Sequence, residues 1–200
     1  MPYEYRKLSA KERQEIVEVR KQRGYPLHSP PHPFREAGSY LITAANFEHK
    51  PIMAAPERRA GFQKLLLSGF QEIGAEIVGW VILPNHYHIL ANVESLDAVS
   101  GLLKHIHGST SHAWNLQDSL AGNRKVWLRF SDYMMRSDEQ FYRTLNYIHN
   151  NPVKHGQVEN VYDWAWSSLF MYVDEMGEDW LRETWKKYKP DANLGKGWDW

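Results

Sequence analysis

Hydrophobic residues follow two kinds of spacing along this chain, and together these spacings predict a small sheet flanked by helices. Four stretches are rich in β-branched, aromatic and other apolar residues, as strands of a folded domain are: 38–44, 76–83, 86–93 and 126–130. Residues 133–135 are a candidate extension of the last stretch. The turn signal Pro84-Asn85 separates the second stretch from the third, so we expect those two strands to run antiparallel.

Apolar residues at helical spacing predict three helices between and after these strands. The first runs from Pro56 to about Gly74, and the second begins after Ser95. The third begins at Ser137, a residue type that caps helices well, and we expect Pro152 to end it. The order of elements predicts an α+β fold, with a ferredoxin-like βαββαβ core, an added C-terminal helix and terminal extensions.

Both ends of the chain differ from this central pattern. We expect an N-terminal arm and proline-rich linker at 1–35, a central domain at 36–175 and a C-terminal tail at 176–200. Ser9 and Glu12 have the spacing of a capping box, which predicts a helix in the arm. Basic residues outnumber acidic ones in the arm, so it is either a solvated helix or a segment that contacts DNA.

The composition narrows the classes of protein and of site. The chain has 200 residues, a formal net charge of zero and no cysteine, which excludes disulfides, thiolate metal sites and a cysteine nucleophile. No stretch approaches the roughly 18 apolar residues of a membrane span, and no signal peptide is recognised, so we expect a cytoplasmic protein. The zero net charge argues against nucleic-acid binding over the whole surface, although a local basic patch is compatible with it.

Two histidines lie on one face of the third predicted strand. Because side chains alternate between the faces of a strand, His86 and His88 point the same way while Tyr87 points the other way. Two neighbouring imidazoles form half of a site for a divalent transition metal. The alternative is a pair of histidines packed in the core.

A phenol and an amide share a face of the last predicted helix. Tyr147 and Asn151 are four residues apart, so the amide could complete a metal site and the phenol could attack a phosphate there. Asn146 and Asn150 form an equally spaced pair on a neighbouring face, so spacing alone does not choose between the pairs. Pro152 also leaves the orientation of Asn151 open, since the residue before a proline resists helical geometry. The alternative for Tyr147 is an ordinary half-buried tyrosine.

Three motifs in this order resemble a known family. Leu-Pro-Asn-His-Tyr-His occupies 83–88, Tyr-Ile-His-Asn-Asn-Pro-Val-Lys-His-Gly occupies 147–156, and Asp-Trp-Ala-Trp-Ser-Ser occupies 163–168. Together they resemble the REP-associated tyrosine transposases, which belong to the single-tyrosine HUH transposases, and the resemblance covers about 40–172. The name HUH denotes two histidines around a hydrophobic residue.

The resemblance implies a role for each residue of the candidate site. His86, His88 and Asn151 match the ligands of a divalent metal, usually Mg²⁺ or Mn²⁺, and Tyr147 matches the nucleophile on a catalytic C-terminal helix. Family members cleave single-stranded DNA beside a hairpin in short palindromic repeats, and they form a 5′-phosphotyrosine intermediate. We expect the protein to bind single-stranded DNA hairpins and no membrane. We also expect it to be associated with the nucleoid, as a monomer or a homodimer.

Basic residues near the motifs are candidates for contacts with DNA phosphates. There are seven of them: Lys104, Arg124, Lys125, Arg129, Arg136, Arg143 and Lys154. Each is alternatively a solvated surface charge, as most Lys and Arg residues are. His149 and His155 are close to the proposed nucleophile in sequence, and we expect them at the surface; the alternatives are proton relays or DNA contacts.

Two other functions fit the same motifs. The chain could be a domesticated DNA-hairpin-binding protein that retains the fold without the chemistry, which its neutral charge and its extra terminal segments favour. It could also be a metal-dependent hydrolase that uses water as the nucleophile and forms no protein–DNA adduct.

Overall fold

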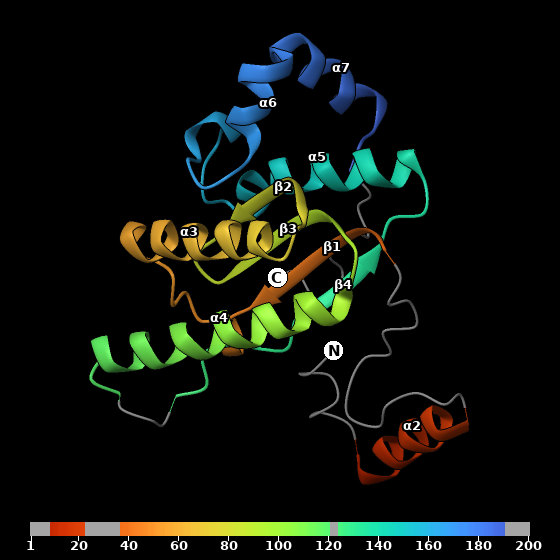
Figure 1. Ribbon diagram of the computed structural model, residues 1–200, viewed down its shortest axis with the longest axis vertical. Coiled ribbons are helices and arrows are strands. Elements are labelled where there is room, and N and C mark those ends of the chain that lie inside the picture. The colour runs from red at the N-terminus through yellow and green to blue at the C-terminus, as the bar shows by residue number, and fades with distance from the viewer. Residues whose placement is uncertain (1–8, 23–36, 121–123, 191–200) are drawn as a thin grey trace. The chain divides into compact units, whose positions relative to one another are not determined.

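The computed structural model describes residues 9–22, 37–120 and 124–190 (Figure 1). Helix α2 (Ala10–Gln22) belongs to a different compact unit from residues 37–190, so the two are described separately. The predicted capping box at the start of α2 is confirmed, because the Ser9 backbone N–H and hydroxyl both donate to Glu12 Oε2, at 2.7 and 2.6 Å. The Glu12 backbone N–H in turn donates to Ser9 Oγ at 3.3 Å.

Within the described residues, an antiparallel sheet of four strands forms the centre of the larger unit (Figure 1). Its order is β2-β3-β1-β4, and the strands are β1 (Gly38–Ala45), β2 (Glu76–Ile82), β3 (His86–Val93) and β4 (Ser131–Met134). Helix α3 (Pro56–Glu72) connects β1 to β2, and helix α4 (Leu96–Gln117) connects β3 to β4. The predicted ferredoxin-like βαββαβ core is therefore confirmed.

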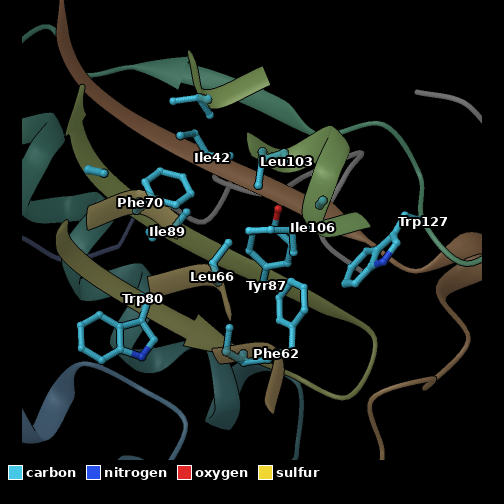
Figure 2. Packing of buried hydrophobic residues seen from close by; sticks show 14 of the residues in the cluster. Ile42, Phe62, Leu66, Phe70, Trp80, Tyr87, Ile89, Leu103, Ile106 and Trp127 are labelled. Carbon is cyan, nitrogen blue, oxygen red and sulfur yellow. The ribbon is translucent and has the colours of Figure 1, made fainter. Parts of the chain in front are cut away.

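Helices α3 and α4 cover one face of this sheet and build the main apolar core. Figure 2 shows Tyr87 and Ile89 of β3 among Phe62 and Leu66 of α3 and Leu103 of α4. All five side chains are buried. Because side chains alternate along β3, the same packing directs its other residues to the opposite face of the sheet.

Helix α5 (Asp138–Lys154) covers that opposite face, against β2 and β3 (Figure 1). The predicted cap is confirmed, since Ser137 Oγ accepts a hydrogen bond from the Gln140 backbone N–H at 3.2 Å. Gly79 of β2 allows the helix to approach closely, because a Cβ at this position would lie 2.6 Å from Leu145 Cδ1. The absence of a side chain at Gly79 therefore sets how near α5 can come to the sheet.

The prediction that Pro152 ends this helix is wrong. Helix α5 continues through Pro152 to Lys154, and its end is a Schellman motif. The Gly156 backbone N–H donates to Val153 O at 2.9 Å and the Gln157 backbone N–H donates to Pro152 O at 2.8 Å. Gly156 has a φ of +62°, which glycine adopts readily, so this residue ends the helix.

The prediction of a fourth strand at 126–130 is also wrong, because β4 begins at Ser131. Val126, Trp127 and Leu128 are all buried. Their backbone instead bonds to the end of β1 and the residues after it, with Leu128 N–H donating to Ala45 O at 2.9 Å. The apolar run fills the core next to β1 before the chain enters β4.

The chain after α5 packs along the outer edge of β2 and over α5. It contains a 3₁₀ turn, η2 (Val161–Asp163), and the helices α6 (Leu169–Met176) and α7 (Glu178–Lys187). Between η2 and α6, the Ile82 backbone N–H donates to Trp166 O at 2.9 Å and the Ser168 N–H donates to Trp80 O at 3.0 Å. No helix in the described part of the chain is long and apolar enough to cross a membrane.

Replacing Gly79 with valine tests the close approach of α5 to the sheet. The added side chain would overlap Leu145, which is itself buried, so we expect the free energy of unfolding to fall by about 1–3 kcal/mol. Urea unfolding monitored by circular dichroism measures this change. Gly101→Ala is the control, because nothing lies within 4 Å of a Cβ there, and we expect it to stabilise α4 by about 0.5–1 kcal/mol. Equal stability of Gly79→Val and the wild type would contradict the packing of α5 on β2.

Candidate functional site

The residues singled out from the motifs meet between α5 and the sheet. His86 and His88 of β3 and Tyr147 and Asn151 of α5 are all buried, none of them more than 3% exposed. His86 Nε2 lies 3.1 Å from Asn151 Oδ1, and the ring centres of His88 and Tyr147 are 5.2 Å apart. The two imidazole rings are edge to face, with centres 5.0 Å apart. All four predicted side chains therefore line one small region.

The geometry of two elements explains this meeting. The alternation along β3 places His86 and His88 on the face opposite Tyr87, as predicted. Because α5 continues past Pro152, Tyr147 and Asn151 remain one helical turn apart on the face that lies over β3.

The structure also separates Asn151 from the competing pair on α5. Asn146 Nδ2 donates to Thr184 O at 3.1 Å and to Tyr188 O at 2.8 Å, so this side chain faces α7. Asn150 is exposed. Only Asn151 of the three reaches a histidine of β3 through a contact at hydrogen-bond distance.

Two side chains behind the histidines fix the orientation of the rings. Asn85 Nδ2 donates to His49 O at 3.3 Å, which turns Asn85 Oδ1 toward His86 Nδ1, 2.7 Å away. Thr43 Oγ1 lies 2.7 Å from His88 Nδ1. Since Nδ1 of each ring is engaged, Nε2 is the nitrogen of each ring that can face a ligand.

The close approach of His86 to Asn151 fits a divalent cation. The bond to Asn85 Oδ1 requires a proton on His86 Nδ1, so Nε2 of a neutral ring carries a lone pair that faces the Asn151 oxygen. Two such acceptors repel unless a cation or a proton lies between them or the amide is turned round. In an octahedral Mg²⁺ site, neighbouring ligand atoms are about 3 Å apart. Among the described residues no group of three or more His, Cys, Asp or Glu side chains could hold a metal ion, and the further donor atom beside His86 is the amide oxygen of Asn151.

Two further residues from the end of α5 border the same region. Lys154 Nζ lies 4.7 Å from the centre of the Tyr147 ring. The rings of His155 and His86 are edge to face with centres 4.8 Å apart, and His155 is half-buried. Of the seven basic residues singled out from the sequence, Lys154 thus lies directly beside the candidate nucleophile.

The other six basic residues lie in several places. Arg124 Nη2 bonds Asp118 Oδ2 at 2.7 Å. Hydrogen bonds to Asp118, mainly from Arg58 and to a lesser extent from Arg124, hold the pKa of this carboxyl below its usual range. Lys125 Nζ lies 4.9 Å from the Phe47 ring centre. The remaining four are exposed: Lys104 on α4, Arg129 and Arg136 on either side of β4, and Arg143 of α5, which bonds Glu139 at 2.7 Å. Their roles in binding DNA stay predictions.

The expectation that His149 lies at the surface is wrong, because this side chain is fully buried. His149 Nε2 lies 2.9 Å from Ser168 Oγ, and burial lowers the pKa of His149 to about 3. Ser168 Oγ also accepts a hydrogen bond from the Trp80 backbone N–H at 3.0 Å. The Ser-Ser end of the third motif therefore joins α5 to β2, a role that no local sequence signal indicated.

Asn85 and Thr43 are the residues near the site that the sequence analysis missed. Asn85 directly precedes His86, so its place in the motif was the available signal for it. Thr43 lies opposite His88 in the pairing of β1 with β3, which only the strand register reveals.

Comparison with known proteins gives the chain its family. No protein-family model matches it. It is 34% identical over 96 residues to the REP-associated tyrosine transposase of Escherichia coli, a match that covers 47% of this chain and about half, 54%, of that relative. It is also 30% identical over 131 residues to a putative REP-associated tyrosine transposase of Haemophilus influenzae. This match covers 58% of this chain and 72% of that relative.

The fold agrees with a solved structure. A REP-associated tyrosine transposase bound to a REP hairpin aligns with a TM-score of 0.59 and 22% identity, over 74% of this chain and 86% of that one. At this identity the likeness establishes the fold. The Haemophilus influenzae relative is 30% identical and matched over 72% of its length, and the fold agrees with this relationship. The chain therefore belongs to the family of REP-associated tyrosine transposases.

Proposed function

We propose that this protein is a metal-dependent single-stranded DNA endonuclease and strand transferase that acts on hairpin-forming, REP-like palindromic repeats. The observation that carries the proposal is the gathering of one phenol, two imidazoles and one amide, from Tyr147, His86, His88 and Asn151, between α5 and β3. The names of the relatives, and the REP hairpin bound to the structural neighbour, support the choice of substrate. The protein would act as a monomer or a homodimer.

Tyr147 is the proposed nucleophile. Its hydroxyl loses a proton and the oxygen attacks the phosphorus of a phosphodiester. The bond from phosphorus to the 3′ oxygen breaks, and the 3′ oxygen takes up a proton, so that no net proton is gained or lost. The 5′ end remains joined to Tyr147 as a phosphotyrosine, so rejoining by a 3′-OH needs no ATP.

The charge that develops in this step needs positive groups nearby. A free phenol has a pKa of about 10 and attacks poorly at neutral pH. Lys154 supplies one positive charge, beside the Tyr147 ring. His86, His88 and Asn151 would hold Mg²⁺ or Mn²⁺, which supplies Lewis-acid polarisation of the phosphate oxygens when bound.

One observation favours a second function, a domesticated hairpin-binding protein without catalysis. Tyr147 is only 3% exposed, whereas a nucleophile must reach its phosphate. On the catalytic proposal, DNA binding exposes the phenol while Lys154 stays beside it. On the alternative, hairpin DNA binds and Tyr147 stays covered.

Replacing Tyr147 with phenylalanine distinguishes these functions. The change removes only the hydroxyl, so we expect no covalent protein–DNA adduct on a REP-type hairpin oligonucleotide with Mg²⁺ or Mn²⁺, while hairpin affinity stays within about threefold of the wild type. Denaturing electrophoresis of end-labelled DNA measures the adduct.

Tyr142→Phe is the matched control for this experiment. Tyr142 lies on the same helix but stacks on Tyr188, so the adduct should persist in that variant. An adduct at full yield in Tyr147→Phe would assign the nucleophile to another residue. Cleavage without an adduct in the wild type would identify a hydrolase, and binding without cleavage would identify the non-catalytic protein.

Alanine variants of two asparagines on α5 test the proposed ligand set. Asn151→Ala removes the amide oxygen beside His86, so we expect Mn²⁺ affinity to fall by about 10-fold or more, and His86→Ala should lose metal and cleavage together. Asn146→Ala removes only the bonds to the α7 region, so it should lower stability and leave Mn²⁺ affinity unchanged. Electron paramagnetic resonance of free Mn²⁺ measures the affinity. Equal losses in both asparagine variants would exclude Asn151 as a ligand.

The salt dependence of hairpin binding tests the basic residues. A residue that neutralises one phosphate should, when changed to glutamine, reduce the slope of log affinity against log salt by about 1. We expect this for Lys154 and Arg136, and Lys104→Gln tests whether α4, on the other face of the sheet from Tyr147, contacts a phosphate as well. Slopes that match the wild type in both Lys154→Gln and Arg136→Gln would exclude these two phosphate contacts.

A further inference from the structure

A strained turn lies directly behind the candidate metal site. The 3₁₀ turn η1 (Phe47–His49) contains Glu48 with a φ of +57° and His49 with a φ of +49°. Residues with a Cβ rarely adopt this left-handed conformation, and two in succession need support from their surroundings. Such local strain often occurs beside functional sites.

The support comes from the loop that leads into β3. The Asn46 backbone N–H donates to Asn85 O at 2.7 Å and the Met53 N–H donates to Pro84 O at 2.8 Å, so the segment around the turn is bonded to this loop at two points. Asn85 Nδ2 adds a third bond, to His49 O at 3.3 Å. The carbonyl of the strained residue therefore serves as the anchor of the Asn85 amide.

This anchor determines which atom of Asn85 meets His86. Because Nδ2 is used at His49, Oδ1 faces His86 Nδ1 at 2.7 Å, and an oxygen there accepts only from a protonated nitrogen. In a free neutral histidine the proton prefers Nε2, which is the nitrogen that faces Asn151 here. The bond to Asn85 favours the opposite arrangement, with a lone pair on Nε2.

We propose that Asn85, held by the η1 turn, is the positioning residue of His86: it orients the ring and keeps the proton on Nδ1, so that Nε2 presents its lone pair to a divalent cation. The inference rests on the proposed function, because it concerns the same metal site. It assigns the Asn of the Leu-Pro-Asn-His-Tyr-His motif to the metal site, where it acts without touching the metal.

Two substitutions at Asn85 separate its two bonds. Asn85→Ala removes the donor to His49 and the acceptor for His86, whereas Asn85→Asp keeps an acceptor for His86 and loses the donor. We expect Asn85→Ala to bind Mn²⁺ about 10–100-fold more weakly than the wild type. Asn85→Asp should bind Mn²⁺ more tightly than Asn85→Ala, as a rescue of the acceptor.

A second measurement uses metal-free protein and does not depend on activity. Long-range ¹H–¹⁵N spectra of the imidazole rings, at about pH 8 where ordinary histidine is neutral, report which nitrogen carries the proton. We expect the Nδ1–H form of His86 in the wild type and in Asn85→Asp, and a shift toward the Nε2–H form in Asn85→Ala.

Asn92→Ala is the matched control. Asn92 is a half-buried residue of the same strand whose side chain bonds Glu76 at 2.8 Å, away from the histidines, so its loss should change neither Mn²⁺ affinity nor the His86 proton. An Asn85→Ala protein with wild-type Mn²⁺ affinity and an unchanged His86 proton would overturn the inference and leave the proposed function intact. Failure of the wild type to bind Mn²⁺ would overturn the metal part of the proposed function, and the spectra would still decide the role of Asn85.

Discussion

The alternation of side chains along β3 is the constraint on which the candidate site depends. Tyr87 and Ile89 must face α3 and α4 to complete the apolar core, and this requirement turns His86 and His88 toward α5. A shift of one residue in the pairing with β1 would turn the imidazoles into the apolar core and the Tyr87 ring toward α5. The hydrophobic core thus sets the direction of the two histidines before any ligand is present.

The other half of the interior is unusually polar, and hydrogen bonds between elements make this arrangement stable. Buried polar groups destabilise a fold unless they find partners. His88 is paired with Thr43 of β1, His149 with Ser168, and Asn146 with the end of α7. The bonds of His149 and Asn146 fix the position of α5 more specifically than apolar contacts would, since each requires a particular distance and direction. The helix that carries the candidate nucleophile is therefore held at two separate points.

Local signals in the sequence were sufficient for most elements and for the main site residues, and the errors arose where tertiary contacts decide or where two local signals compete. The run 126–128 has the composition of a strand, but its burial comes from filling the core beside β1. Pro152 is a general helix-ending signal, yet the bonds around Gly156 end this helix. Spacing could not choose between Asn151 and Asn146, because the choice depends on α7, which packs over Asn146 from nearly forty residues further along the chain.

The place where α5 ends has an electrostatic consequence. The last turns of this helix carry Tyr147 and Asn151, so its carboxyl end, which is the negative end of the helix dipole, lies at the site. Many proteins bind phosphate at the opposite, amino end of a helix, where the field is favourable. A phosphate at this end of α5 would meet an unfavourable field, whereas a cation would be attracted to it. Lys154 in the final turn offsets part of this field.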